Sequence, residues 1–388
     1  MSLTPLPRTI FNEDHDTFRA AVRAFTEREV VPNLLRWAGQ QHIDRSLWRE
    51  AADIGLLGIE VPERFGGGGV KDFRFNAIVI EELCAVGATS IAMGLTSFND
   101  LIAPYFLALG TDAQKQRWLP PMCRGDLIGA IAMTEPGTGS DLAAIASTAV
   151  PEGNGFRLNG AKTFITNGIQ ADVILVVAKT DSTAGRRGIS LLIVEDGMPG
   201  LTKQGPLPKV GLHAQDTAEL HFDDVRIPAE NLLGELNMGF SYLRGNLPQE
   251  RLNIAVGSMA STSRVFDLAL EHATQRRAFG QRIADFQANR FYLAELATEV
   301  QIAQVFLDRC ILDAVHGHLD DAHAAMAKWW ISELYLKVVQ RAVQLHGGYG
   351  FMAEYAVAQE YLDSRAATLY GGTTEIMKEI IGRRLVAT

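Results

Sequence analysis

The sequence lacks an apolar run long enough to cross a membrane, and residues 1–9 lack the basic-then-apolar pattern of a secretion signal. Cysteine is also scarce, since Cys84, Cys123 and Cys310 are the only three and none belongs to a CxxC pair. Isolated cysteines in apolar surroundings favour buried free thiols over disulfides or a metal site. We therefore expect a cytoplasmic protein with no membrane span.

Basic charge is in short supply as well. Lys and Arg number 36 against 45 Asp and Glu, which leaves a net charge of -9 and a pI near 5.5. Because no basic run or arm is present to neutralise phosphates, a nucleic-acid partner is not expected. The nine histidines show no metal-binding spacing such as HExxH, so we also expect no metal ion.

What the chain does have is length and apolar content. With 388 residues, 47% of them hydrophobic, it exceeds one typical core and should form two or three domains. Residues 1–126 carry helical patterns, in which Asn12 can cap a first helix and Thr111 with Gln114 forms a plausible capping box. Four glycines at 66–69 follow no strand and lack dinucleotide-binding spacing, so we interpret them as a flexible connection.

The pattern changes twice further along the chain. Residues 127–236 contain short β-rich runs separated by turn residues, with no amphipathic helix between them, which predicts an antiparallel β domain. Residues 237–388 return to helical segments and predict a four-helix bundle, with a first long helix at Pro248–Thr274. The expected fold class is α+β, with an N-terminal helical domain, a middle antiparallel β domain and a C-terminal four-helix bundle.

One stretch joins an expected strand to a loop that could face a ligand. The apolar run at 127–133 ends in the polar segment 134–141, which holds two glycines, a proline and several hydroxyls. Glycine lets a backbone approach a flat ligand, while free N–H groups and hydroxyls can bond ring nitrogens or phosphates. On this segment alone, an ordinary turn is the simpler interpretation.

Two motifs change that interpretation. Met133–Asp141 reads MTEPGTGSD and Gln344–Phe351 reads QLHGGYGF. They resemble the two signatures of the acyl-CoA dehydrogenase family, and the three-part layout resembles that family over nearly the full length. Gln359 departs from the second signature, where a basic residue is usual. The resemblance implies an enzyme that binds FAD without a GxGxxG loop, and the sequence contains no such loop.

Family positions carried over residue by residue suggest how FAD is held. Phe164 could stack on the flavin ring, and Arg276 is similar to the arginine that meets the pyrophosphate, where a planar guanidinium can bond phosphate oxygens in pairs. A neighbouring subunit of a homotetramer should complete the site. The cofactor positions implied by the resemblance are Ile131, Met133, Thr134, Gly139, Ser140, Phe164, Thr166, Arg276, Phe279, Gln287, Gln344, Gly347, Gly348, Thr373 and Glu375.

The reaction implied by the resemblance is dehydrogenation of an acyl-CoA to trans-2-enoyl-CoA. A base takes the α proton, the β carbon gives a hydride to flavin N5, and electrons pass to an electron-transferring flavoprotein. Many family members carry the base where Gly371 stands here, and a glycine cannot take a proton. Glu250, in the string LPQERL, resembles the base of long-chain and isovaleryl-CoA members, and burial should raise its pKa. Alternatives are Glu375 as the acid, or Glu250 as a surface acid paired with Arg251.

Substrate contacts follow the same resemblance. Ser140 could meet the CoA moiety, Arg251 the thioester or the pantetheine arm, and the Gly372 N–H the thioester carbonyl. Ala92 and Gly94 could line the far end of the acyl slot, although helix packing explains them equally well. Two other functions stay open: an oxygen-using flavoenzyme similar to acyl-CoA oxidases, and a non-catalytic scaffold that binds FAD or acyl-CoA.

Overall fold

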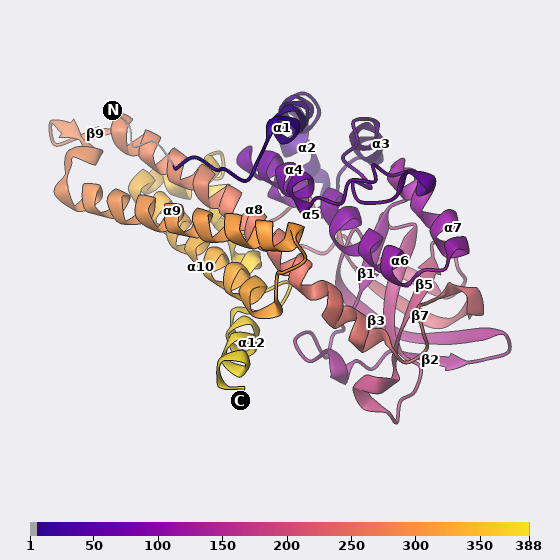
Figure 1. Ribbon diagram of the computed structural model, residues 1–388. Helices are drawn as coiled ribbons and strands as arrows, with labels where there is room; N and C mark the ends of the chain where they lie inside the picture. The colour runs from indigo at the N-terminus through magenta and orange to yellow at the C-terminus, as the bar shows by residue number, and fades with distance from the viewer. Residues whose placement is uncertain (1–5, 388) are drawn as a thin grey trace.

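The computed structural model of the protein describes residues 6–387, which form helical, β and again helical parts along the chain (Figure 1). Asn12 and Thr111 cap helices as expected, because each forms a complete capping box with the residue three positions later. The N-terminal helices are α1 (Glu13–Phe25), α2 (Leu34–Gln40), α3 (Arg45–Asp53), α4 (Phe73–Ala85), α5 (Thr89–Ser97), α6 (Ala103–Leu109) and α7 (Asp112–Cys123).

The four glycines at 66–69 form a closely packed loop, which differs from the flexible connection expected. The N–H of Gly68 donates to the carbonyl of Gly58 at 3.0 Å, and that of Gly69 donates to Val61 at 2.9 Å. A Cβ placed on Gly67 would lie 2.2 Å from the Val61 carbonyl oxygen. Glycine is therefore required at 67 because two backbone segments approach each other there.

The middle part is an eight-stranded sheet in the order β6-β7-β3-β2-β4-β5-β8, with β1 beside β4. The strands are β1 (Gly129–Ala132), β2 (Thr148–Pro151), β3 (Gly155–Thr166), β4 (Val173–Lys179), β5 (Ile189–Glu195), β6 (Leu201–Gln204), β7 (Thr217–Pro228) and β8 (Leu232–Leu233). Most neighbours are antiparallel, but β1 runs parallel to β4, as does β2 at a single residue pair. The expected antiparallel β domain is therefore confirmed except at β1 and β2, and the long segment between β1 and β4 provides the crossover that a parallel pair needs.

The sheet is buried on both faces at β4 and β5. Alternate residues of β4 pack into two cores: Leu175 joins the core shared with the helices, and Val176 joins a second core within the β part. Burial of both faces explains why these strands read as unbroken apolar runs. Cys84, Cys123 and Cys310 are all buried and free, as expected from their surroundings.

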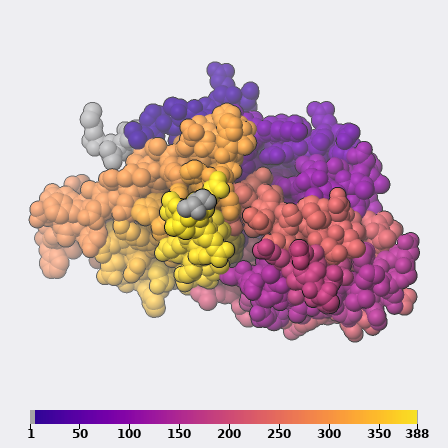
Figure 2. Space-filling model, turned by 60° about the horizontal axis from the view of Figure 1, so that its bottom comes forward, coloured from indigo at the N-terminus to yellow at the C-terminus, as the bar shows by residue number. Residues whose placement is uncertain are grey.

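The C-terminal part is an elongated bundle in which α8, α9 and α10 lie along one another (Figure 1). Its elements are α8 (Gly239–Gln275), β9 (Arg277–Ala278), β10 (Gln281–Arg282), α9 (Gln287–Val315), α10 (Asp321–His346), α11 (Ala356–Ser364) and α12 (Thr374–Val386). The first helix begins at Gly239 rather than at Pro248, so that proline lies inside it. The hairpin β9–β10 and α11 were not expected from the sequence. Figure 2 shows α12, in yellow, against the bundle.

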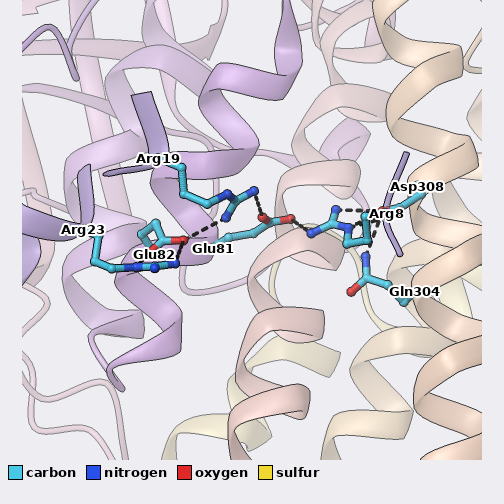
Figure 3. Close-up of polar contacts among 7 residues, drawn as sticks. All are labelled: Arg8, Arg19, Arg23, Glu81, Glu82, Gln304 and Asp308. Atoms are coloured by element: carbon cyan, nitrogen blue, oxygen red, sulfur yellow. Dashed lines mark hydrogen bonds and ion pairs between the residues drawn. The ribbon is translucent and has the colours of Figure 1, made fainter. Parts of the chain in front are cut away.

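A chain of ion pairs joins the N-terminal segment and α1 to α4 and α9 (Figure 3). Arg8 contacts Glu81 of α4 at 2.8 Å and Asp308 of α9 at 2.7 Å. Arg19 of α1 contacts Glu81 at 2.7 Å and Glu82 at 2.8 Å.

Within residues 6–387, no helix has both the length and the apolar content to span a membrane.

Candidate active site

A cavity of about 350 Å³ lies where α4, α5 and α8 meet β1, the end of β3 and the loop before α12. Its lining joins segments far apart in the sequence, from the second half of α4 to the start of α12. Ten of the site residues predicted from the sequence line it: Ile131, Met133, Thr134, Gly139, Ser140, Phe164, Thr166, Glu250, Arg251 and Gly372.

Glu250 projects from α8 and is only 7% exposed. Its Oε1 accepts hydrogen bonds from Asn246 Nδ2 at 3.3 Å and from the Tyr105 hydroxyl at 3.4 Å. Burial raises the pKa of Glu250 to about 7, because a charged carboxylate loses its hydration there, and the two hydrogen bonds only partly oppose this. Arg251 pairs with Asp321 instead, so the alternative of a surface acid paired with Arg251 is wrong.

A second buried carboxyl lines the same cavity and was missed from the sequence. Asp100 lies in the π-helical turn Phe98–Ile102 and accepts a hydrogen bond from Asn76. Burial raises its pKa to about 7 as well. An acid within an apolar helical stretch is the signal that could have revealed it. π-helical turns occur often at functional sites, which adds weight to this position.

A buried lysine also escaped the sequence analysis. Lys328 of α10 is fully buried, and its Nζ donates a 2.6 Å hydrogen bond to the carbonyl oxygen of Gly372. Burial, helped by the nearby Arg251 cation, lowers the pKa of Lys328 to about 8. A single lysine in the apolar run that begins α10 was the available signal.

The loop after β1 is held from behind by a buried ion pair. Lys162 of β3 donates to Glu135 at 2.8 Å and to the carbonyl oxygen of Met133 at 3.0 Å. The same carboxylate accepts from the N–H groups of Ala146 and Ser147. Three donors on one carboxylate, together with the bond from Lys162 to Met133, fix the path of the segment 133–141, so its hydroxyls and glycines keep their place at the cavity.

The cavity suits a large flat ligand. Phe164 lines it with a side chain that is 68% exposed, an unusual state for a phenylalanine between the buried residues Thr163 and Ile165. Its φ of 61° lies in the left-handed region, where bulky residues are rare. Backbone strain of this kind is typical of ligand-binding positions. An exposed aromatic ring beside Thr134 and Thr166 therefore fits an isoalloxazine ring.

The remaining predicted cofactor residues do not line this cavity. Most of them lie at the end of the bundle that is far from the cavity, where the hairpin β9–β10 forms the tip (Figure 1). There the rings of His272 and His346 stack with centroids 4.0 Å apart and join the ends of α8 and α10. The residues at this end are Arg276, Phe279, Gln287, Gln344, Gly347 and Gly348, and all of them are exposed.

Thr373 and Glu375 adjoin Gly372 but do not line the cavity either. Thr373 caps α12, and Glu375 sits exposed in the first turn of that helix. An exposed acid outside the cavity cannot replace Glu250, so the alternative assignment to Glu375 is not supported by this geometry.

Two further sequence interpretations can be compared with the structure. Ala92 lines the cavity, but Gly94 does not: a Cβ there would meet Asn167 and Ile43, each at 3.2 Å. Gly94 therefore does not line the acyl slot, and the alternative account, helix packing, explains it. Gln359 donates to Asp363 at 2.9 Å, and Asp363 lines the cavity, which gives this unusual glutamine a supporting contact.

Comparison with known proteins assigns the family. Domain models described as acyl-CoA dehydrogenase N-terminal, middle and C-terminal domains match residues 12–126, 130–225 and 237–386. The chain belongs to the acyl-CoA dehydrogenase family. It is 46% identical to the long-chain specific acyl-CoA dehydrogenase, mitochondrial, of Sus scrofa, over 98% of this chain and 88% of that protein. A caffeyl-CoA reductase-Etf complex subunit of Acetobacterium woodii is 35% identical, over 97% of this chain and 99% of that subunit.

Solved structures of family members share the fold. The crystal structure of an acyl-CoA dehydrogenase from Geobacillus kaustophilus has a TM-score of 0.96 and 46% identity, covering 98% of this chain and 100% of that one. A glutaryl-CoA dehydrogenase from Mycobacterium smegmatis in complex with FADH2 has a TM-score of 0.89 and 26% identity, covering 98% and 96%. FAD is the cofactor of the acyl-CoA dehydrogenase family, in agreement with the form of the cavity around Phe164.

Proposed function

We propose that the protein dehydrogenates an acyl-CoA thioester to trans-2-enoyl-CoA with FAD as cofactor and Glu250 as the base. The observation that carries the proposal is the state of Glu250: a buried carboxyl with a pKa raised to about 7, in the cavity that holds the exposed ring of Phe164. A base with a pKa near the working pH combines a useful ionised fraction with strong proton affinity. A non-catalytic scaffold has no need of such a group.

The chain's own residues account for the proton transfer. Because Asn246 and Tyr105 both bond Oε1 of Glu250, its other oxygen has no partner among the described residues and is free to take the α proton. N–H groups of the loop at Gly372 can hold the thioester carbonyl and stabilise the charge that develops on it. FAD, when bound beside Phe164, supplies the hydride acceptor for the β carbon.

Replacing Glu250 with glutamine tests the assignment of the base. The variant should bind FAD and acyl-CoA but lose flavin bleaching, because an amide of nearly the same shape cannot take a proton. The assay is anaerobic titration of the yellow protein with a panel of acyl-CoA thioesters. Glu230→Gln, at an exposed acid of the β part, is the matched control, and Glu375→Gln tests the competing acid. Bleaching by Glu250→Gln at the parent rate would contradict the assignment.

We propose that a second subunit completes the FAD site, within a homotetramer. Support comes from the separation of the predicted cofactor residues into a cavity group and a group at the bundle tip, where Phe279 is 96% exposed. Apolar side chains are also exposed on α9, as at Phe291 and Ile302. Light scattering should give four times the chain mass of 42.4 kDa. The pair Phe291→Asp and Ile302→Asp should lower both the mass and FAD retention, and a monomer that retains FAD would refute this proposal.

The electron acceptor is proposed to be an electron-transferring flavoprotein. The relative from Acetobacterium woodii, whose name places it in a reductase-Etf complex, supports this choice. The alternative is an oxygen-using enzyme, and turnover measured with the flavoprotein and with oxygen under matched conditions separates the two.

A cytoplasmic location stays a prediction, which cell fractionation tests. We also propose domains at 1–126, 127–236 and 237–388, with limited proteolysis as the test.

A further inference from the structure

The loop at Tyr370–Thr373 presents two glycines to the cavity. Gly371 and Gly372 both line it, with φ values of 63° and 97° in the region that favours glycine. Neither N–H group donates a hydrogen bond to another residue of the described chain. Two unpaired donors beside the acyl-CoA site are suited to binding the thioester carbonyl, provided the loop that carries them is held in place.

The loop receives one strong anchor from outside itself. Lys328 reaches it from α10, and its Nζ lies 2.6 Å from the Gly372 carbonyl oxygen. Hydrogen bonds from a charged donor are roughly twice as strong as those between neutral groups. Burying a lysine is unfavourable without such a partner, so the contact constrains both the side chain and the peptide it holds.

We propose that Lys328 is a positioning residue, whose ammonium group fixes the Gly372 carbonyl and thereby aims the loop N–H groups at the thioester carbonyl. The inference rests on the proposed function, because it assumes that an acyl-CoA binds in this cavity. Lys328 itself does not line the cavity, so it acts through the loop rather than on the substrate.

The charges around Lys328 set the pH range over which the anchor holds. Arg251 of α8 faces it and is paired with Asp321, while the acids Glu333 of α10 and Glu375 of α12 attract it. Burial and Arg251 outweigh those acids and lower the pKa to about 8. Below that pH the ammonium is present, and above it the neutral amine is a weaker donor. Activity should therefore decline on the alkaline side with a midpoint near pH 8.

Three variants separate positioning from mere packing. Lys328→Met removes the charge and should lower kcat/KM at pH 7 by about tenfold, with no alkaline limb near pH 8. Lys328→Arg keeps a charge that does not titrate here, so it should retain more activity and also lack the limb. Lys337→Met, at an exposed lysine further along α10, is the control and should keep the parent profile.

A spectroscopic measurement reads the loop without turnover. In the Glu250→Gln background, an acyl-CoA carrying ¹³C at the thioester carbonyl should show a lowered carbonyl stretch when bound. Adding Lys328→Met should return that stretch toward the value of the free thioester. The proposal is overturned if adding Lys328→Met leaves the carbonyl stretch unchanged, or if the activity of Lys328→Arg declines near pH 8 as that of the parent does. The second result can be obtained even if Lys328→Met fails to fold. Failure of the proposed function would instead show as a parent protein that no acyl-CoA bleaches.

Discussion

Replacing Tyr105 with phenylalanine should move the acid limb of the pH profile of kcat/KM to higher pH. The hydroxyl of Tyr105 donates to Oε1 of Glu250 at 3.4 Å, and this bond favours the charged carboxylate. Phenylalanine keeps the buried ring and removes only the donor. Glu250 is then left with Asn246 as its one described donor, so burial raises its pKa further.

The size of the shift follows from the strength of that hydrogen bond. A net contribution of about 0.5–1.5 kcal/mol is usual, and a 3.4 Å contact belongs at the lower end. Since one pKa unit corresponds to about 1.36 kcal/mol, the acid limb should rise by about 0.4–0.7 units. Below the limb, where little base is ionised, kcat/KM should fall about 2.5-fold to fivefold, while the pH-independent value obtained by fitting both the acid and the alkaline limb changes less.

The assay is kcat/KM from pH 5.5 to 9 with one acyl-CoA and an artificial electron acceptor. Tyr361→Phe, at a half-exposed tyrosine with no role in the cavity, is the control and should leave the limb in place. A limb that stays fixed in Tyr105→Phe, or moves to lower pH, refutes the hydrogen-bond argument. A uniform loss at every pH indicates disturbed packing instead.

Two other predictions concern the scaffold. Arg8→Ala removes contacts with α4 and α9 and should lower the free energy of unfolding by about 1–3 kcal/mol, measured as a lower thermal midpoint at fixed protein and FAD concentration. The control Arg28→Ala breaks an exposed ion pair between adjacent residues and should change the midpoint little. Equal midpoints for the two variants would contradict this prediction. Gly371→Ala should also lower the thermal midpoint, because its Cβ would lie 2.1 Å from Ile254 Cδ1. Adding Ile254→Val removes that Cδ1 and should recover part of the loss. If the effects of the two substitutions simply add, this explanation is wrong.

Local patterns were sufficient to predict much of the fold and of the cavity. Strand β4 begins and ends where its apolar run does, and the helix cap at Asn12 and the capping box at Thr111 can each be predicted from a few adjacent residues. The family motifs added positions that no local pattern supplies, which is why Met133 and Glu250 could be assigned to one site before their meeting in space was known.

The contacts that could not be predicted join residues far apart in the chain. Lys328 meets Gly372, and Lys162 meets Glu135, and nothing in the local sequence shows which distant residue each lysine contacts. The start of α8 was misjudged for a related reason. Proline is disfavoured inside helices, so Pro248 suggested a beginning, whereas tertiary packing carries the helix through it.

The structure offers a reason why a base on α8 goes with glycine at position 371. Ile254 stands one helical turn after Glu250, on the same face of α8, and its Cδ1 fills the space that a Cβ on residue 371 would need. The positive φ of Gly371 further disfavours any side chain there. A glutamate at 371 would therefore clash with the helix that presents Glu250, and a further carboxylate beside Glu250 would add to the repulsion in a cavity that Asp100 also lines. Moving the base between these positions requires changes at Glu250, Ile254 and Gly371 together.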